Sequence, residues 1–240
     1  MKRIACACLL CLMPLCSWAV EEGPELAKAD IDLGDEKSLQ RGARTFVNYC
    51  LTCHSATYMR FSRMAKDLRL SDKLVADNLM FVTDKVGNTM NVTMLAKESE
   101  AWFGMVPPDL SVIARSRGVD WLYTFLTSFY LDPSRPTGVN NRVFKDTAMP
   151  HVLWELQGFQ EPVLEAGGEK KITALKLTKP GKLDESAYRQ TVNDLVNFLE
   201  YLGEPAALER KRLGPRVLLF LAAFGIIAYL LKREYWKDLH

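Results

Sequence analysis

Two cysteines separated by two residues, and followed at once by a histidine, stand in the sequence at Cys50, Cys53 and His54. This spacing is typical of covalent haem attachment, because two thiols on one short turn can bond the two vinyl groups of a porphyrin. The adjacent histidine then lies under the ring as an axial ligand of the iron. The motif therefore predicts one covalently bound haem c per chain.

A zinc site or a redox pair built on the same cysteines is the alternative. A structural zinc ion takes four ligands. Beyond residue 19 the chain offers only these two cysteines and the histidines His54, His151 and His240. A thioredoxin-like site needs alternating strands and helices, and the sequence around residue 50 shows no such alternation. We therefore favour haem.

The sixth ligand of the iron decides what a haem can do. An iron with one protein ligand binds small molecules or performs oxygen chemistry, whereas an iron with both axial positions filled transfers electrons. Met149 is the favoured distal ligand, because it follows a long loop and Pro150 fixes the backbone directly after it. Other ligands remain open, namely His151 in the same loop and the methionines Met80, Met90, Met94 and Met105.

A secretory signal peptide is predicted at residues 1–19, where Lys2 and Arg3 precede an apolar stretch and Ala19 provides a small residue for cleavage. Four of the six cysteines of the chain lie inside this leader, so the even cysteine count does not indicate a disulfide framework. We expect the exported cytochrome domain to span residues 20–209. Export agrees with haem c, which is attached outside the cytoplasm.

An uncharged run of 15 residues, Val217 to Leu231, lies near the C-terminus. A helix of that length covers about 22 Å, less than the roughly 30 Å hydrocarbon core, so its flanks must extend it. We expect a transmembrane anchor over residues 210–236 and a cytoplasmic tail at 237–240, with a buried core helix as the alternative. Together with the signal peptide, this predicts a single-pass protein of the inner membrane whose haem domain is periplasmic.

The charge of the exported domain limits its partners. Residues 20–208 contain 22 Lys and Arg against 26 Asp and Glu, a net charge of −4. This balance argues against nucleic-acid binding, and it is compatible with a basic protein partner.

The haem motif needs helices to position it. Apolar residues at helical spacing predict helices over 38–49, where Ser38 is the expected cap, and over 109–115, 119–130 and 188–202. Residues 132–138 are rich in proline and glycine and predict a loop, and residues 160–177 predict a hairpin. The fold class expected is therefore mainly α: a c-type haem domain with long loops, a small β-hairpin and one C-terminal transmembrane helix.

Several motifs together resemble the cytochrome c1 family, the membrane-anchored haem subunits of quinol:cytochrome c oxidoreductase (the cytochrome bc1 complex). The resemblance covers nearly the whole chain after the leader. It rests on the haem signature at 50–54, Pro-Pro-Asp-Leu-Ser at 107–111, Ala-Met-Pro at 148–150, and the stretch 193–199 followed by Glu204-Pro205, a basic segment and the apolar helix.

This resemblance implies a one-electron carrier, which accepts an electron from the Rieske iron–sulfur subunit and passes it to a cytochrome c. It implies cytochrome b as a further partner, a dimeric complex, and no enzyme activity of the chain by itself. It also implies haem contacts: Met149 as distal ligand, Arg115 pairing with a propionate, and Pro107, Pro108 and Trp121 shaping the pocket. The extra cysteine pair that braces the haem domain of some relatives is missing.

Two other functions fit the haem motif. A tail-anchored cytochrome of another periplasmic pathway would keep the haem and the anchor, but it would not associate with a cytochrome b. A haem enzyme would leave the distal position of the iron open.

Overall fold

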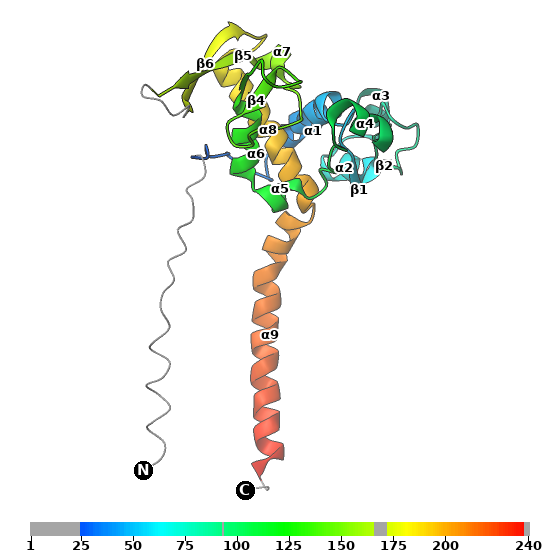
Figure 1. Ribbon diagram of the computed structural model, residues 1–240. Coiled ribbons are helices and arrows are strands. Elements are labelled where there is room, and N and C mark those ends of the chain that lie inside the picture. Colours follow the sequence, from blue (N-terminus) through cyan, green and yellow to red (C-terminus); the bar gives the residue numbers. More distant parts are fainter. Residues whose placement is uncertain (1–24, 93, 166–171, 238–240) are drawn as a thin grey trace, which may run out of the picture.

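The computed structural model describes residues 25–92, 94–165 and 172–237 (Figure 1). It shows a mainly helical head from which one long helix, α9, extends. Small two-stranded sheets lie within the head. The expected fold class is confirmed. The predicted signal peptide, residues 1–19, lies outside the described residues.

Helices α1 (Glu36–Tyr49) and α8 (Glu185–Gly203) form the centre of the head. They approach closely at Gly42, where a Cβ atom would overlap the carbonyl of Asp194. One turn further along, the rings of Phe46 and Phe198 lie 5.5 Å apart and are fully buried. This contact positions the end of α1, where the cysteine motif begins.

Polar side chains fix the same pair of helices. Asp194 of α8 accepts hydrogen bonds from Arg41 at 2.5 and 2.9 Å and from the hydroxyl of Ser38 at 2.7 Å. The expectation that Ser38 caps α1 was wrong, because Asp35 caps it by accepting from the Ser38 amide at 3.0 Å. The Ser38 hydroxyl is thereby free to bind Asp194, which ties the first turn of α1 to α8.

Two short helices follow the turn at 107–111. Helix α5 (Ile113–Arg117) begins later than the predicted 109–115, because the Asp109 carboxylate accepts from the Ser111 amide at 2.7 Å and holds a turn there. Helix α6 (Val119–Thr127) follows directly.

The predicted helix 119–130 is too long at its end. The Asn141 side chain donates to the Phe125 carbonyl at 2.7 Å, which takes up one of the free carbonyls at the end of α6. Strand β3 (Phe129–Leu131) then pairs with β4 (Val139–Asn141) across the loop predicted at 132–138.

The remaining elements surround this centre. Strand β1 (Ala56–Arg60) pairs with β2 (Thr89–Met90). The predicted hairpin is confirmed and is longer than expected, with β5 (Gly158–Leu164) against β6 (Ile172–Pro180). The short helices are α2 (Phe61–Asp67), α3 (Asp72–Asn78), α4 (Ala96–Phe103) and α7 (Trp154–Gln157).

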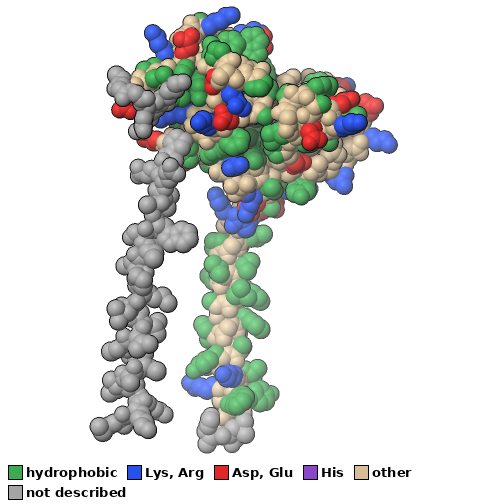
Figure 2. All heavy atoms as spheres, in the orientation of Figure 1, with side chains coloured by type: hydrophobic (Ala, Val, Ile, Leu, Met, Phe, Trp, Pro, Cys, Tyr) green, Lys and Arg blue, Asp and Glu red, His purple; other side chains and the backbone are tan. Residues whose placement is uncertain are grey.

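Helix α9 (Ala207–Tyr235) is long and apolar enough to cross a membrane, and its apolar window is not buried against the head. Its 29 residues span about 43 Å, which exceeds the roughly 30 Å hydrocarbon core. Figure 2 shows apolar side chains around its middle, with basic side chains where it leaves the head and again near its far end. The alternative of a buried core helix is therefore wrong for this segment.

Candidate haem site

A largely apolar cavity of about 240 Å³ lies in the head beside the cysteine motif. Cys50, Cys53 and His54 line it, together with residues of the segment 103–113, helices α6 and α8, and the loop 144–152. Met149 of that loop is also part of the wall. The cavity thus brings together the proximal motif and the favoured distal ligand, which are 95 residues apart in the sequence.

The cysteines lie on a tight turn that continues the end of α1. The Cys50 amide donates to the Phe46 carbonyl at 2.8 Å, and the amides of Cys53 and His54 donate to the Cys50 carbonyl at 3.0 and 2.8 Å. Both thiols are free, and burial raises the pKa of Cys50 to about 12 and also raises the pKa of Cys53. The turn therefore presents two neutral thiols to one cavity.

The His54 ring is fixed by the proline segment. Its Nδ1 lies 2.7 Å from the carbonyl oxygen of Pro108. A carbonyl can only accept, so Nδ1 must carry the proton and Nε2 keeps its lone pair. Burial lowers the pKa of His54, and the bond to Pro108 opposes this shift. Such a hydrogen bond is how proteins orient a metal-binding imidazole.

The segment that supplies this carbonyl is itself held in place. Asp109 accepts from the Thr57 amide at 3.0 Å and the Thr57 hydroxyl at 2.8 Å. Burial raises the pKa of the Asp109 carboxyl, but hydrogen bonds from Ser111 and Thr57 lower it by more, so the group stays ionised. The Leu110 amide donates to the Ser55 carbonyl at 2.8 Å. These contacts connect both sides of the His54–Pro108 bond.

Of the five methionines considered as distal ligands, two lie on the cavity wall and three do not. Met149 and Met105 line the cavity, whereas Met80 and Met90 are buried in the core and are not part of its wall. Met94 is half-buried and also lies outside the wall. Two methionines of the head are thus in a position to face a bound group.

His151, the competing ligand, does not line the cavity, although its neighbours Pro150 and Val152 do. It is buried, and its ring stacks on Phe129 with centroids 4.9 Å apart. Burial lowers the pKa of His151 to about 4, against weaker opposing effects of Gln157 and Gly158. The structure therefore places a neutral His151 in the core behind the loop.

The pocket residues proposed from the resemblance divide into two groups. Pro107, Pro108 and Trp121 line the cavity. Arg115 does not, because its Nη1 donates to Glu204 at 2.8 Å and its side chain is 56% exposed. Arg117 lines the cavity instead.

Arg117 was not singled out from the sequence. Its guanidinium carbon lies 5.2 Å from the Trp121 ring centre and 5.8 Å from that of Phe144. The sequence gives weak evidence for Arg117, because Arg115 and Arg117 stand only two residues apart. Which of the two faces the cavity depends on where α5 begins. Phe144 was missed because no pattern marks a single aromatic residue in a loop.

The set of donors fits a haem c. Two free thiols, an imidazole with an available Nε2, a thioether and one guanidinium surround an apolar space, which suits a flat apolar ring with iron at its centre and carboxylates at its edge. In the described ranges of the chain, no three His, Cys, Asp or Glu side chains gather into a set that could hold a metal ion. These described ranges therefore contain no ligand set for a structural zinc ion.

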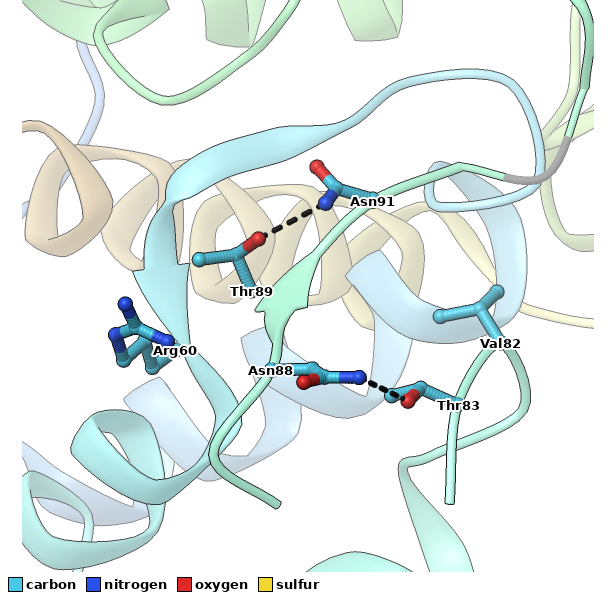
Figure 3. Close-up of a pocket in the computed structure, with 6 residues that line it drawn as sticks. All are labelled: Arg60, Val82, Thr83, Asn88, Thr89 and Asn91. Atoms are coloured by element: carbon cyan, nitrogen blue, oxygen red, sulfur yellow. Dashed lines mark hydrogen bonds between the residues drawn. The ribbon is translucent and has the colours of Figure 1, made fainter. Parts of the chain in front are cut away.

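A second hollow, of about 410 Å³, lies near strands β1 and β2 (Figure 3). It is lined by Arg60, Val82, Thr83, Asn88, Thr89 and Asn91. Its polar side chains are already paired: Asn88 donates to Thr83 at 2.7 Å and Asn91 to Thr89 at 2.9 Å. It shares no lining residue with the haem cavity and brings no thiol, imidazole or thioether.

Comparison with known proteins finds relatives that cover most of the chain. The profile of the Cytochrome C1 family matches residues 183–239. The chain is 49% identical to a cytochrome c1 of Allochromatium vinosum over the whole of both chains, and 26% identical to one of Rhodospirillum rubrum over 85% of this chain and 82% of the other. It is also 49% identical to a Nitrosomonas europaea protein described as ammonia monooxygenase gamma subunit, over 95% of each chain.

A chain of a solved hyperthermophilic respiratory Complex III is similar over 90% of this chain at 14% identity, and its TM-score of 0.38 is too low to support an argument. The full-length match to the Allochromatium protein is sufficient by itself. Together with a cavity that joins Cys50, Cys53, His54 and Met149, it shows that the chain belongs to the cytochrome c1 family.

Proposed function

We propose that this protein is the membrane-anchored one-electron carrier of a cytochrome bc1 complex, which takes an electron from the Rieske iron–sulfur subunit and gives it to a cytochrome c. Members of the family carry covalently bound haem c, and the chain is an electron-transfer subunit rather than an enzyme by itself. The observation that carries the proposal is the His54–Pro108 hydrogen bond, which leaves His54 Nε2 available in the cavity that Met149 also lines.

In this assignment Cys50 and Cys53 would hold the haem through thioether bonds, and His54 and Met149 would supply the nitrogen and sulfur ligands of its iron. The haem supplies a ferric–ferrous couple when bound. The protein's part would be to supply a ligand from each of His54 and Met149, so that no small molecule binds the iron, and to keep water away with an apolar wall. A thioether ligand raises the reduction potential relative to a second imidazole.

Arg117 is the residue that we assign to a haem propionate, in place of Arg115. A carboxylate at the edge of an apolar cavity needs a cationic donor, and Arg117 is the arginine of this segment that reaches the wall. The stacking of Arg117 against Trp121 and Phe144 orients its guanidinium. Pro107, Pro108 and Trp121 form the adjacent wall.

We infer the position in the cell from the two ends of the chain. We assign residues 1–19 as a signal peptide and the head as periplasmic, with α9 anchoring it in the inner membrane and the last residues in the cytoplasm. Basic residues precede the apolar part of α9 at Arg210, Lys211 and Arg212 and follow it at Lys232 and Arg233, where they can reach lipid headgroups. Cytochrome b and a second copy of the complex are the further partners proposed.

The distal ligand provides the first test. In Met149→Leu, we expect loss of the weak sulfur-to-iron charge-transfer band of the ferric protein and a lower reduction potential, since leucine cannot coordinate iron. Met105→Leu is the matched control, because Met105 is the other methionine on the wall. It should leave the spectrum and the potential unchanged.

The opposite outcome would support a different function. If Met149→Leu left the spectrum unchanged, and the wild-type ferrous protein bound carbon monoxide without losing a ligand, the distal position would be open. The protein would then be a haem enzyme or a small-molecule sensor. If Met105→Leu alone removed the band, the distal ligand would be Met105.

A further inference from the structure

The loop that carries Met149 also carries His151, whose side chain is buried and does not line the haem cavity. Pro150 and Val152 line the cavity on either side of it, whereas His151 is only 6% exposed and points into the core. Its ring stacks on Phe129 of strand β3 with an interplanar angle of 6°. The loop therefore has one face toward the cavity and one residue fixed in the core.

A pair of polar atoms lies behind the same loop. His151 Nε2 and Gln157 Oε1 are both buried, and within the described part of the chain neither has a hydrogen-bond partner. A ring N–H can donate and an amide oxygen can only accept, so the two groups are complementary. Gln157 is also the first of the groups that raise the pKa of His151 against the effect of burial, so the two side chains lie close together. An unpaired buried polar group costs stability, so a small shift that pairs them is favoured.

Gln157 is itself anchored to the framework. Its amide Nε2 donates to the Thr127 carbonyl at 3.1 Å, and Gln160 donates to the same carbonyl at 3.0 Å. The Trp154 amide donates to the His151 carbonyl at 3.2 Å, which starts the turn leading to Gln157. A chain of contacts thus runs from the Met149 loop through Gln157 to the end of helix α6.

We propose that His151 is a positioning residue for the distal ligand: its stacking on Phe129 and its buried polar contact with Gln157 hold the 147–152 loop so that Met149 can reach the iron of a bound haem. The proposal rests on the assignment of Met149 as the sixth ligand. A neutral thioether binds iron weakly, so it is retained only where the loop that presents it is held in place. Among the described residues, the Met149 backbone makes one weak local hydrogen bond, from its amide to Thr147 Oγ1 at 3.3 Å.

Three variants separate the stacking on Phe129 from the polar contact with Gln157. His151→Phe keeps an aromatic ring for the stack on Phe129 and removes the polar contact, and Gln157→Leu removes the same polar contact from its other end. His151→Ala removes both contacts. Glu155→Gln is the control, since Glu155 lies in the same segment and its contact is an exposed pair with Lys182.

The readouts are the sulfur-to-iron charge-transfer band and the dissociation constant of cyanide for the ferric haem of the membrane-anchored protein. Loss of an aromatic pair and a buried polar contact should make cyanide bind roughly tenfold more tightly in His151→Ala, with a weakened band. His151→Phe and Gln157→Leu should each give a smaller change, roughly threefold. Glu155→Gln should match the wild type.

The results distinguish this proposal from the one on which it rests. If Met149→Leu abolishes the band but His151→Ala binds cyanide like the wild type, Met149 remains the ligand and the positioning role of His151 is wrong. If His151→Ala fails to incorporate haem, the smaller changes in His151→Phe and Gln157→Leu decide, and wild-type behaviour in both overturns the proposal. A wild-type spectrum of two imidazole ligands would overturn both assignments, because His151 would then be the ligand itself.

Discussion

Two arginines of one short helix contact different parts of the molecule. Arg117 lines the haem cavity and lies over the Trp121 ring, whereas Arg115 pairs with Glu204 where the head meets the anchor. The Glu204 carboxylate also accepts from Arg210 at 2.5 and 2.9 Å. A positive charge beside a haem disfavours the ferric state, which carries one more positive charge than the ferrous state.

Replacement of these arginines should therefore have different consequences. In Arg117→Gln, we expect the reduction potential to fall by the equivalent of roughly a tenfold change in the redox equilibrium, about 59 mV for one electron. In Arg115→Gln, the potential should stay at the wild-type value, because this side chain does not reach the cavity. Potentiometric titration of the haem absorbance measures both variants. A fall in Arg115→Gln with no change in Arg117→Gln would mean that Arg115 is the propionate partner.

At the scale of elements, the position of the haem motif depends on the packing of α1 against α8. Gly42 allows this close approach, since any side chain there would meet both the Asp194 carbonyl and the Phe198 side chain. Because α1 ends at the cysteine turn, a shift of α1 also moves Cys50 relative to the cavity wall that α8 contributes through Leu195 and Leu199.

Gly42→Ala should consequently destabilise the protein by about 1–3 kcal/mol, as overpacking of a well-filled contact does. For a chain of this size that corresponds to a fall in Tm of several degrees. Gly87→Ala is the control, because a Cβ atom at Gly87 would meet no neighbour within 4 Å. Thermal unfolding of the detergent-purified haem protein, followed by circular dichroism, measures the difference. Equal Tm values for Gly42→Ala and the wild type would show that α1 and α8 can move apart with no loss of stability.

The elements also show which parts of the fold the sequence can predict. The apolar spacing of α1 and α8 predicts both helices, because their stability comes from an apolar face that is visible in the sequence. The residues of β3 continue the helical pattern of α6, so the sequence does not predict this strand. It forms because it pairs with β4 and because the Asn141 side chain ends α6. Long-range contacts of this kind have no local signal.

The same distinction applies to the site. Spacing alone predicts Cys50, Cys53 and His54 as haem-binding residues, and the loop with its following proline predicts Met149; the structure shows that all four line one cavity. The place of Arg117 on the cavity wall depends on where α5 begins, and the inward direction of His151 depends on which side of the loop meets Phe129. Both are results of tertiary packing and cannot be read from the residues one by one.

At the scale of the whole molecule, the head and the anchor are joined over a very short distance. Helix α8 ends at Gly203 and α9 begins at Ala207, with Glu204 between them held by Arg115 and Arg210 (Figure 1). A short and paired connection restricts how far the head can move from the membrane surface. We expect this arrangement to keep the haem within reach of neighbouring subunits of a membrane complex.

The central claim is that the haem of this chain carries electrons within a cytochrome bc1 complex. The most direct test is purification of the protein from membranes in mild detergent, with identification of the copurifying subunits and a reduced-minus-oxidised spectrum after addition of a quinol. We predict that a cytochrome b and an iron–sulfur protein copurify, and that quinol produces a low-spin ferrous haem c. Purification of the haem protein alone, with a high-spin spectrum and no reduction by quinol, would contradict the account.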